Sequence, residues 1–164
     1  MTPKLMNRTA VAIALAALAA TARVHAADIL TGDARSACEA ILCLSSSTRP
    51  SECSPSLQRY FGITRRRLSD TINARRAFLQ QCPAAGSDSR MQALVQAISE
   101  GAGRCDAASL NATLATWVGG ADGGYYLIAD TLPPYCASYT GNAYTDLRPA
   151  VYVGTPGVDG RWIE

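Results

Sequence analysis

The stretch ACEAILCLSSSTRPSECSPSL, residues 37–57, holds three of the six cysteines of this chain and determines how its first helix must be attached. A helix over residues 34–44 would carry one apolar stripe made of Ala34, Cys38, Ile41 and Leu44. Cys38 and Cys43 would point about 140° apart on that helix, with Cα atoms about 8–9 Å from each other, which is too wide for a direct bond. Each cysteine therefore needs a partner elsewhere, and the pattern predicts a helix cross-linked on two sides.

All six cysteines follow an apparent export signal, and an even number in that context is typical of a disulfide framework. A zinc site is the alternative, but the CxxC spacing and the histidines typical of such sites are missing. Six cysteines permit fifteen pairings, and the sequence does not choose among them. Our working hypothesis has three pairs: Cys43–Cys53 across a loop, Cys38–Cys82 between helices, and Cys105–Cys136 to the tail.

Residues 1–26 have the pattern of a secretory signal peptide. Lys4 and Arg8 precede the apolar run 10–20, and Val24-His25-Ala26 supplies the residues expected before a cleavage site. The run is shorter than the roughly 20 residues of a membrane-spanning helix. We therefore expect cleavage after Ala26, export to the periplasm, and no stable membrane span in the mature chain.

Composition narrows the function classes. Removing 26 residues from 164 leaves 138, a length typical of one domain, with 12 arginines against 13 acidic residues. The resulting formal charge of −1 does not favour a nucleic-acid partner. Because Lys4 and His25 are the only lysine and histidine, the mature chain lacks the commonest general base, nitrogen metal ligand and Schiff-base former. We expect no enzyme activity, no metal and no cofactor.

Four further helices are expected between the polar loop 45–56 and residue 118. Ser54-Pro55 is typical of a helix start and opens a short helix toward Phe61. Thr64 is expected to cap a helix that ends before Pro83, with Phe78 at the edge of an apolar arc made of Leu68, Ile72, Leu79 and Cys82. The next helix spans 88–100, with Met91, Leu94, Val95 and Ile98 on its inner face, and the last runs from Asp106 to about Val118.

From Gly119 onward glycine, proline, tyrosine and aspartate dominate, and the β-prone runs are short: 125–128, 150–153 and 161–163. The predicted fold class is mainly α, a single disulfide-stapled helical domain. It comprises a helical region, 27–118, and an irregular Tyr/Gly/Pro-rich extension, 119–164, with at most a small β hairpin. Two interpretations of the tyrosines in this extension stay open, a partner surface and the cover of a small core.

Arginines are dense between residues 49 and 76, where seven of them accompany only two acids, Glu52 and Asp70. Such a cluster favours binding to an acidic protein face, an anionic lipid or a wall polymer. The alternative is an ordinary solvated helix face with an i,i+4 pair between Arg66 and Asp70. The candidate partner-binding residues are Arg49, Glu52, Arg65, Arg66, Arg67 and Arg76.

Arg75 is a separate case, because a helix over this segment would place it within the apolar arc, where a charge needs a partner or a route to water. We expect a structural ion pair with Glu39 of the first helix. A recognition role for Arg75 is the alternative.

Residues 30–63, LTGDARSACEAILCLSSSTRPSECSPSLQRYFGI, closely resemble the TrbM family of plasmid conjugal-transfer proteins, also called KikA or MpfK. The likeness continues more loosely to Pro83 and then rests on GRC at 103–105 and the tyrosine-rich end. The resemblance implies a periplasmic component of the mating-pair-formation (type IV secretion) machinery, whose partners are periplasmic components of that system. It carries no catalytic residues across.

Two other functions stay open. Export and the position of Glu39 beside a cysteine suggest a cell-wall-acting enzyme or its regulator, although neither Glu39 nor Glu52 has the surroundings of a glycosidase acid. A serine hydrolase would need a histidine, and the glycines at 119–124 do not form a phosphate loop. A host-effect toxin is the third hypothesis.

Overall fold

The computed structural model describes residues 30–120 and 123–164, so the expected signal peptide, 1–26, lies outside the described residues. The described part is mainly helical, as expected. Its six α-helices are α1 (Gly32–Ser45), α2 (Ser54–Gly62), α3 (Leu68–Leu79), α4 (Ser89–Gly101), α5 (Ala107–Thr113) and α6 (Pro134–Thr140). Two short 3₁₀ helices, η1 (Ser51–Cys53) and η2 (Pro83–Gly86), precede α2 and α4.

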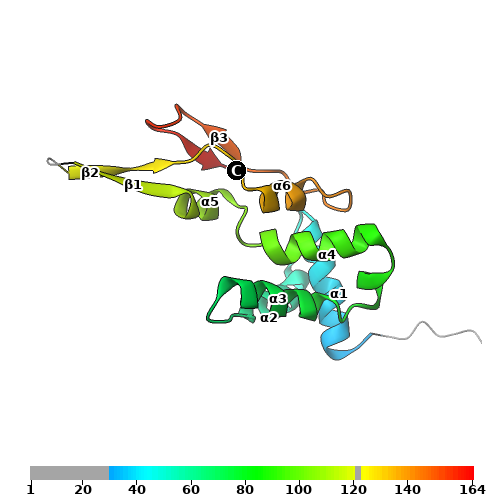
Figure 1. Ribbon diagram of the computed structural model, residues 1–164. Coiled ribbons are helices and arrows are strands. Elements are labelled where there is room, and N and C mark those ends of the chain that lie inside the picture. Colours follow the sequence, from blue (N-terminus) through cyan, green and yellow to red (C-terminus); the bar gives the residue numbers. More distant parts are fainter. Residues whose placement is uncertain (1–29, 121–122) are drawn as a thin grey trace, which may run out of the picture.

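The core lies where α1 crosses α3 and α4, which run alongside each other (Figure 1). The inner face of α1 carries Ala37 and Ala40, both fully buried, and these small side chains let the crossing helices approach closely. Leu44, Leu79 and Ile98 are also fully buried there. The buried positions of α1 recur every three or four residues, which is the helical period predicted from the sequence.

Three disulfides attach the helices to one another and to the segments between them. Cys38 of α1 bonds to Cys82 after α3, Cys43 of α1 to Cys53 of η1, and Cys105 to Cys136 of α6. These are the three pairs of the working hypothesis. The two cysteines of α1 thus leave the helix toward different partners, as their spacing requires.

The β structure is more extensive than the single small hairpin expected. β1 (Ala115–Gly120) pairs antiparallel with β2 (Gly123–Ile128), and β3 (Val151–Val153) pairs with β4 (Arg161–Ile163). The helix expected to reach Val118 ends at Thr113 because the following residues pair with β2 instead. The extension also contains a helix, α6, which begins at Pro134, a residue suited to the first helical position.

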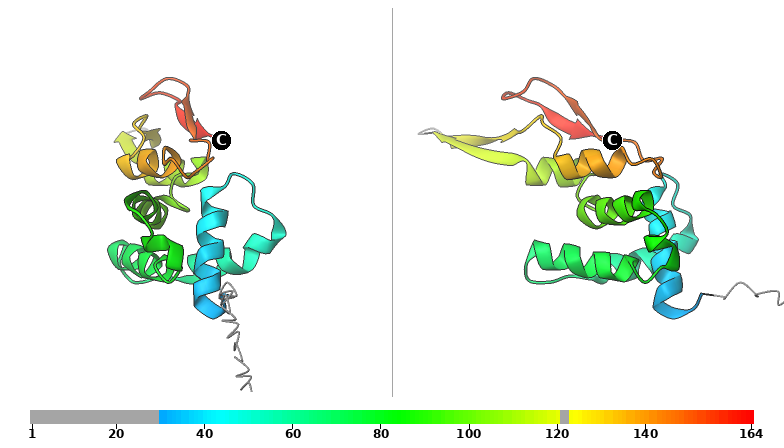
Figure 2. Two further views of the ribbon diagram at one scale, coloured as in Figure 1. Left: turned by 90° about the vertical axis from the view of Figure 1, so that its right-hand side faces the viewer. Right: turned by 45° about the vertical axis from the view of Figure 1, so that its right-hand side comes forward.

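The strands β1 and β2 form a projection that we call the arm, residues 115–120 and 123–128 (Figures 1 and 2). Its base is held by hydrogen bonds from the C-terminal strands. Tyr152 donates to the Ile128 carbonyl at 2.9 Å, and the Trp162 indole donates to the Ala129 carbonyl at 3.0 Å. Toward its end the arm leaves the helices and exposes both of its faces.

The start of α3 also differs from the prediction. Thr64 does not cap this helix, which begins four residues later, at Leu68. Leu68 is 53% exposed and lies outside the apolar arc, whereas Thr71 is buried. The reason is that the Thr71 hydroxyl bonds to the backbone of the preceding loop, which keeps residues 64–67 out of the helix.

Candidate functional site

The loop between α2 and α3 carries three consecutive arginines, Arg65, Arg66 and Arg67, which we call the arginine loop. The Thr71 hydroxyl accepts a hydrogen bond from the Arg65 N–H at 2.8 Å and donates to the Arg67 carbonyl at 3.2 Å. Because Thr71 is only 8% exposed, these bonds are shielded from water. The backbone of the loop is therefore held in place while the three arginine side chains are exposed.

Arg75 holds the backbone of the residues that lead into the arginine loop. Its Nε donates to the Ile63 carbonyl at 3.2 Å and its Nη2 to the Phe61 carbonyl at 3.3 Å. Its guanidinium also lies 5.0 Å from the centroid of the Tyr60 ring. Carbonyls at a helix C-terminus and aromatic faces both attract cations, so Arg75 obtains its stabilisation from the end of α2.

The expected ion pair between Arg75 and Glu39 is wrong. Glu39 instead accepts a hydrogen bond at 2.7 Å from Arg35, one turn earlier on α1. The prediction failed because it paired charges without considering the unpaired carbonyls at the end of α2, which satisfy Arg75 without a carboxylate.

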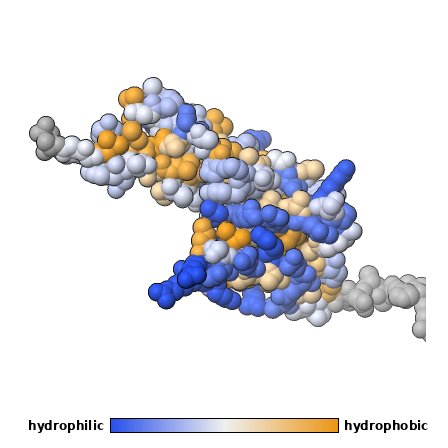
Figure 3. Space-filling view, viewed as in Figure 1, coloured by the Kyte–Doolittle hydropathy of each residue, from blue (hydrophilic) through white to orange (hydrophobic). Residues whose placement is uncertain are grey.

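The arginine loop takes part in none of the ion pairs within the described residues. These pairs are Arg35–Glu39, Arg59–Asp33 and Arg76–Glu100. The alternative pair between Arg66 and Asp70 is therefore not formed. Figure 3 shows the result as a strongly hydrophilic projection at the lower left, where Figure 1 places the connection between α2 and α3.

Arg76, another candidate, belongs to a different surface. Its Nη2 contacts Glu100 of α4 at 3.3 Å, and its Nε donates to the Ser99 hydroxyl at 3.4 Å. The side chain is thus engaged between α3 and α4. We therefore separate it from the arginine loop.

Beside the arginine loop, α2 and α3 enclose a groove of about 650 Å³, which we call the α2–α3 groove. Its apolar lining comes from Ile63, Ala74, Ala77 and Phe78, and its polar lining from Gln58, Arg59, Arg65 and Gln81. Arg65 therefore belongs to both the loop and the groove. The structure joins these two features into one surface.

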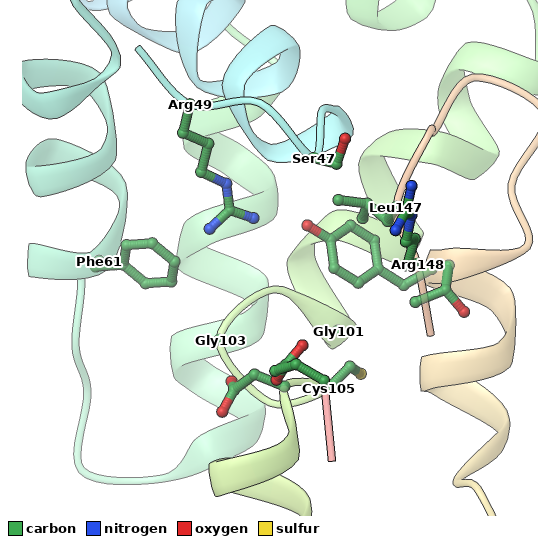
Figure 4. Close-up of a pocket in the computed structure, with 12 residues that line it drawn as sticks. Ser47, Arg49, Phe61, Gly101, Gly103, Cys105, Leu147 and Arg148 are labelled. Carbon is green, nitrogen blue, oxygen red and sulfur yellow. The ribbon is translucent and has the colours of Figure 1, made fainter. Parts of the chain in front are cut away.

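Arg49 lies on yet another surface, in a cleft of about 390 Å³. Its Nε donates to the Cys43 carbonyl at 3.2 Å, and its guanidinium points into the cleft between Phe61 and Leu147 (Figure 4). Burial raises the pKa of Tyr139 in the same cleft to about 12, against an opposing effect of the Arg49 charge. Glu52 lines a separate hollow beside Leu42, so the structure does not bring Arg49 and Glu52 together.

Two glycines shape this cleft. A Cβ at Gly101 would lie 2.6 Å from the Cβ of Tyr139, and a Cβ at Gly103 would lie 2.8 Å from the Phe61 ring. Gly103 also has a φ of +74°, in the region that favours glycine. In the sequence, Gly101 and Gly103 stand two residues apart, and a closely spaced glycine pair is a signal for such close approach.

Sequence reasoning also missed the exposed aromatics of the arm. Trp117 is 56% exposed, Tyr125 56% and Tyr126 64%. The sequence predicts a small hairpin in the extension, but residues 115–118 of the first strand fall within the helix expected to reach Val118. The signal available was the run TWVGG followed by GGYYLI, in which two β-prone segments flank a glycine-rich turn.

Within residues 30–120 and 123–164, no group of three His, Cys, Asp or Glu side chains is arranged to hold a metal ion. None of the helices described there is both long and apolar enough to cross a membrane.

These features define a class: a small, mainly helical protein held by three disulfides, with a basic surface on one side and an aromatic arm on another. A model of the TrbM family matches residues 29–164. The chain belongs to the TrbM family and is therefore a protein related to conjugal transfer, which confirms the resemblance seen in the sequence. Neither the curated proteins nor the solved structures contain a match.

Proposed function

We propose that the mature chain acts in the periplasm as an accessory component of the conjugative mating-pair-formation (type IV secretion) machinery, and that it works by binding other components of that machinery. The observation that carries this proposal is the arginine loop. Its backbone is ordered by Thr71 and Arg75, while its three arginine side chains are exposed and take part in none of the described ion pairs. A preordered, exposed set of cations is suited to an acidic protein surface.

The three disulfides support the periplasmic part of the proposal. Disulfides form and persist in oxidising compartments and are rare in the bacterial cytosol. All six cysteines are used, so none remains as a free thiol in the described structure. Membership of a conjugal-transfer family supports the choice of partners.

Binding is preferred over wall chemistry because of where Glu39 lies. The acid of a glycoside hydrolase typically sits in apolar surroundings with a second carboxylate across the sugar. Glu39 and Glu52 line one hollow, but the Glu39 carboxylate contacts the Arg35 guanidinium at 2.7 Å, so its surroundings are those of a salt bridge rather than of a glycosidase acid. No observation in the described structure favours a host-effect toxin.

The test compares two double variants in donor cells. Arg66→Ala/Arg67→Ala removes two charges from the arginine loop, and Arg90→Ala/Arg161→Ala removes two exposed charges elsewhere. After in-cell cross-linking, we expect the wild type and the second variant to recover components of the mating-pair apparatus from the periplasmic fraction. We expect the first variant to recover at least tenfold less and to lower transfer frequency.

Two outcomes would count against the proposal. If both variants recovered the same amount of these components, the arginine loop would not be part of the binding surface. Recovery of no secretion-system component by the wild type would contradict the binding function itself.

A further inference from the structure

The α2–α3 groove has an apolar interior that this chain does not fill. Its accessible apolar surface comes from Ala77, which is exposed, and from Ala74, which is partly exposed, whereas Phe78 lines the groove but is only 4% exposed. Ile63, also partly exposed, belongs to the same lining. A groove with an apolar wall of small residues accepts an aliphatic or aromatic side chain, because burying such a side chain removes apolar surface from water on both partners.

The charged side chains that line the groove are both arginines, Arg59 and Arg65. Arg59 is paired with Asp33 at 2.8 Å, so its charge is offset, whereas Arg65 takes part in none of the described ion pairs. Arg65 extends the positive rim toward Arg66 and Arg67. Exposed charges contribute modest affinity but select the sign of the partner, so the rim favours acidic ligands.

The remaining polar residues distinguish a protein segment from a lipid surface. Gln58 of α2 and Gln81 after α3 are both exposed and line the groove. A carboxamide donates and accepts hydrogen bonds at once, which suits the N–H and C=O groups of a peptide backbone. Phospholipid head groups carry no N–H and C=O groups at peptide spacing, and a bilayer is flat whereas this site is recessed between two helices.

We infer that the α2–α3 groove binds an acidic peptide segment, with an aliphatic or aromatic side chain against Ala74 and Ala77 and a carboxylate beside Arg65. The inference rests on the proposed function in taking the ligand to be a protein. It goes further by naming the binding groove and the chemistry of the segment that occupies it.

The test uses the purified, oxidised mature protein and a phage-displayed library of random peptides. We expect the selected sequences to be enriched in Asp and Glu together with Leu, Ile, Phe or Trp. One selected peptide is then synthesised, and its affinity is measured for the wild type, Ala77→Glu and Ala93→Glu. Both alanines are exposed helix positions, but only Ala77 lines the groove.

Ala77→Glu places a carboxylate inside the groove, so we expect the dissociation constant to rise at least tenfold, with less than a twofold change for Ala93→Glu. Gln81→Glu is a second groove variant, and thermal melting verifies that all three variants are folded. Selection of basic peptides, or equal binding by Ala77→Glu and Ala93→Glu, would overturn the inference. So would binding to phosphatidylglycerol vesicles, which displaces the peptide, because it would assign the site to lipid.

This experiment separates the two proposals. The experiment in donor cells changes Arg66 and Arg67, whereas the experiment in solution changes Ala77. If capture from cells depends on the arginine loop but no peptide depends on Ala77, the binding function stands and the groove is not its site.

Discussion

The helical part of the molecule and the arm place their apolar residues in opposite ways. In the helices, Leu44, Leu79 and Leu94 are at most 2% exposed. In the arm, Trp117 is 56% and Tyr126 64% exposed. The cysteines follow the same division, since two disulfides hold α1 while the arm contains no cysteine.

What orders the arm is local. The Trp117 ring lies across the backbone of Gly124, where a side chain would collide with it, and packs edge-to-face against Tyr126 with ring centroids 5.0 Å apart. Two-stranded hairpins are marginally stable alone, so the arm depends on its anchored base. Stability therefore resides in the cross-linked helices, and the aromatic residues of the arm are available for contacts.

The largest loss of stability is expected when a disulfide that holds the helices is removed. The Cys38–Cys82 bond has a sequence separation of 44, and the Cys43–Cys53 bond one of 10. The chain-entropy model assigns about 4 kcal/mol to the longer loop and about 3 kcal/mol to the shorter. We therefore expect Cys38→Ser/Cys82→Ser to lower the free energy of unfolding more than Cys43→Ser/Cys53→Ser does, as measured by urea denaturation. A larger loss in the second variant would contradict this ranking.

An intermediate effect is expected from Tyr139, whose hydroxyl donates to the Leu44 carbonyl at 2.5 Å and links α6 to α1. Burial raises its pKa from 10.0 to about 12. A raised folded-state pKa means that folding favours the neutral phenol, so its stabilisation is complete below pH 10 and is lost as the pH rises from 10 through 12. A shift of this size corresponds to about 2–3 kcal/mol.

Urea midpoints measured between pH 8 and about pH 12 test this dependence. Tyr139→Phe should reduce the decline above pH 10, with the remainder coming from the fully buried Tyr60, whose pKa burial also raises. The lost hydrogen bond should cost about 1 kcal/mol at neutral pH. Tyr144→Phe is the control, because that side chain is 42% exposed. The same alkaline slope in Tyr139→Phe and the wild type would show that the buried phenol is not its source.

The smallest effect should come from the arm. Trp117→Ser removes an aromatic ring that is mostly in water, and exposed substitutions usually change stability by less than about 0.5 kcal/mol. We expect the melting temperature to change little and the near-ultraviolet circular dichroism to lose the Trp117–Tyr126 signal. A loss of stability as large as that caused by removing a disulfide would contradict this prediction, because it would show that the arm stabilises the helical core.

Much of the helical part could be predicted from the sequence because its signals are local. The spacing of apolar residues located α1 and α4. The helix expected over 88–100 spans Ser89–Gly101, and Asp88 caps it by accepting bonds from the N–H groups of Arg90 and Met91. The start of α3 could not be predicted in this way. The bond from the Arg65 N–H to the Thr71 hydroxyl competes with helix formation at the residues before Leu68, and such competition is visible only when both ends are in place.

For the candidate surface, too, the sequence predicted only part of what the structure shows. The arginine cluster was evident in the sequence, but which arginines are available was not. Arg75 turns to the carbonyls at the end of α2, Arg76 to Glu100 and Arg59 to Asp33. Arg65, Arg66 and Arg67 are exposed and take part in none of the described ion pairs, and they lie beside a groove formed by two helices.

The sequence alone determined the helical character of the first part, the need of each cysteine in α1 for a distant partner, and the family. Those properties depend on residue spacing within one segment, which a linear pattern records. Only the tertiary structure decided the partner of Arg75, the helix α6 and the exposure of the arm. These depend on which hydrogen-bonding groups and apolar faces remain unpaired after the helices pack, and that remainder is a property of the whole fold.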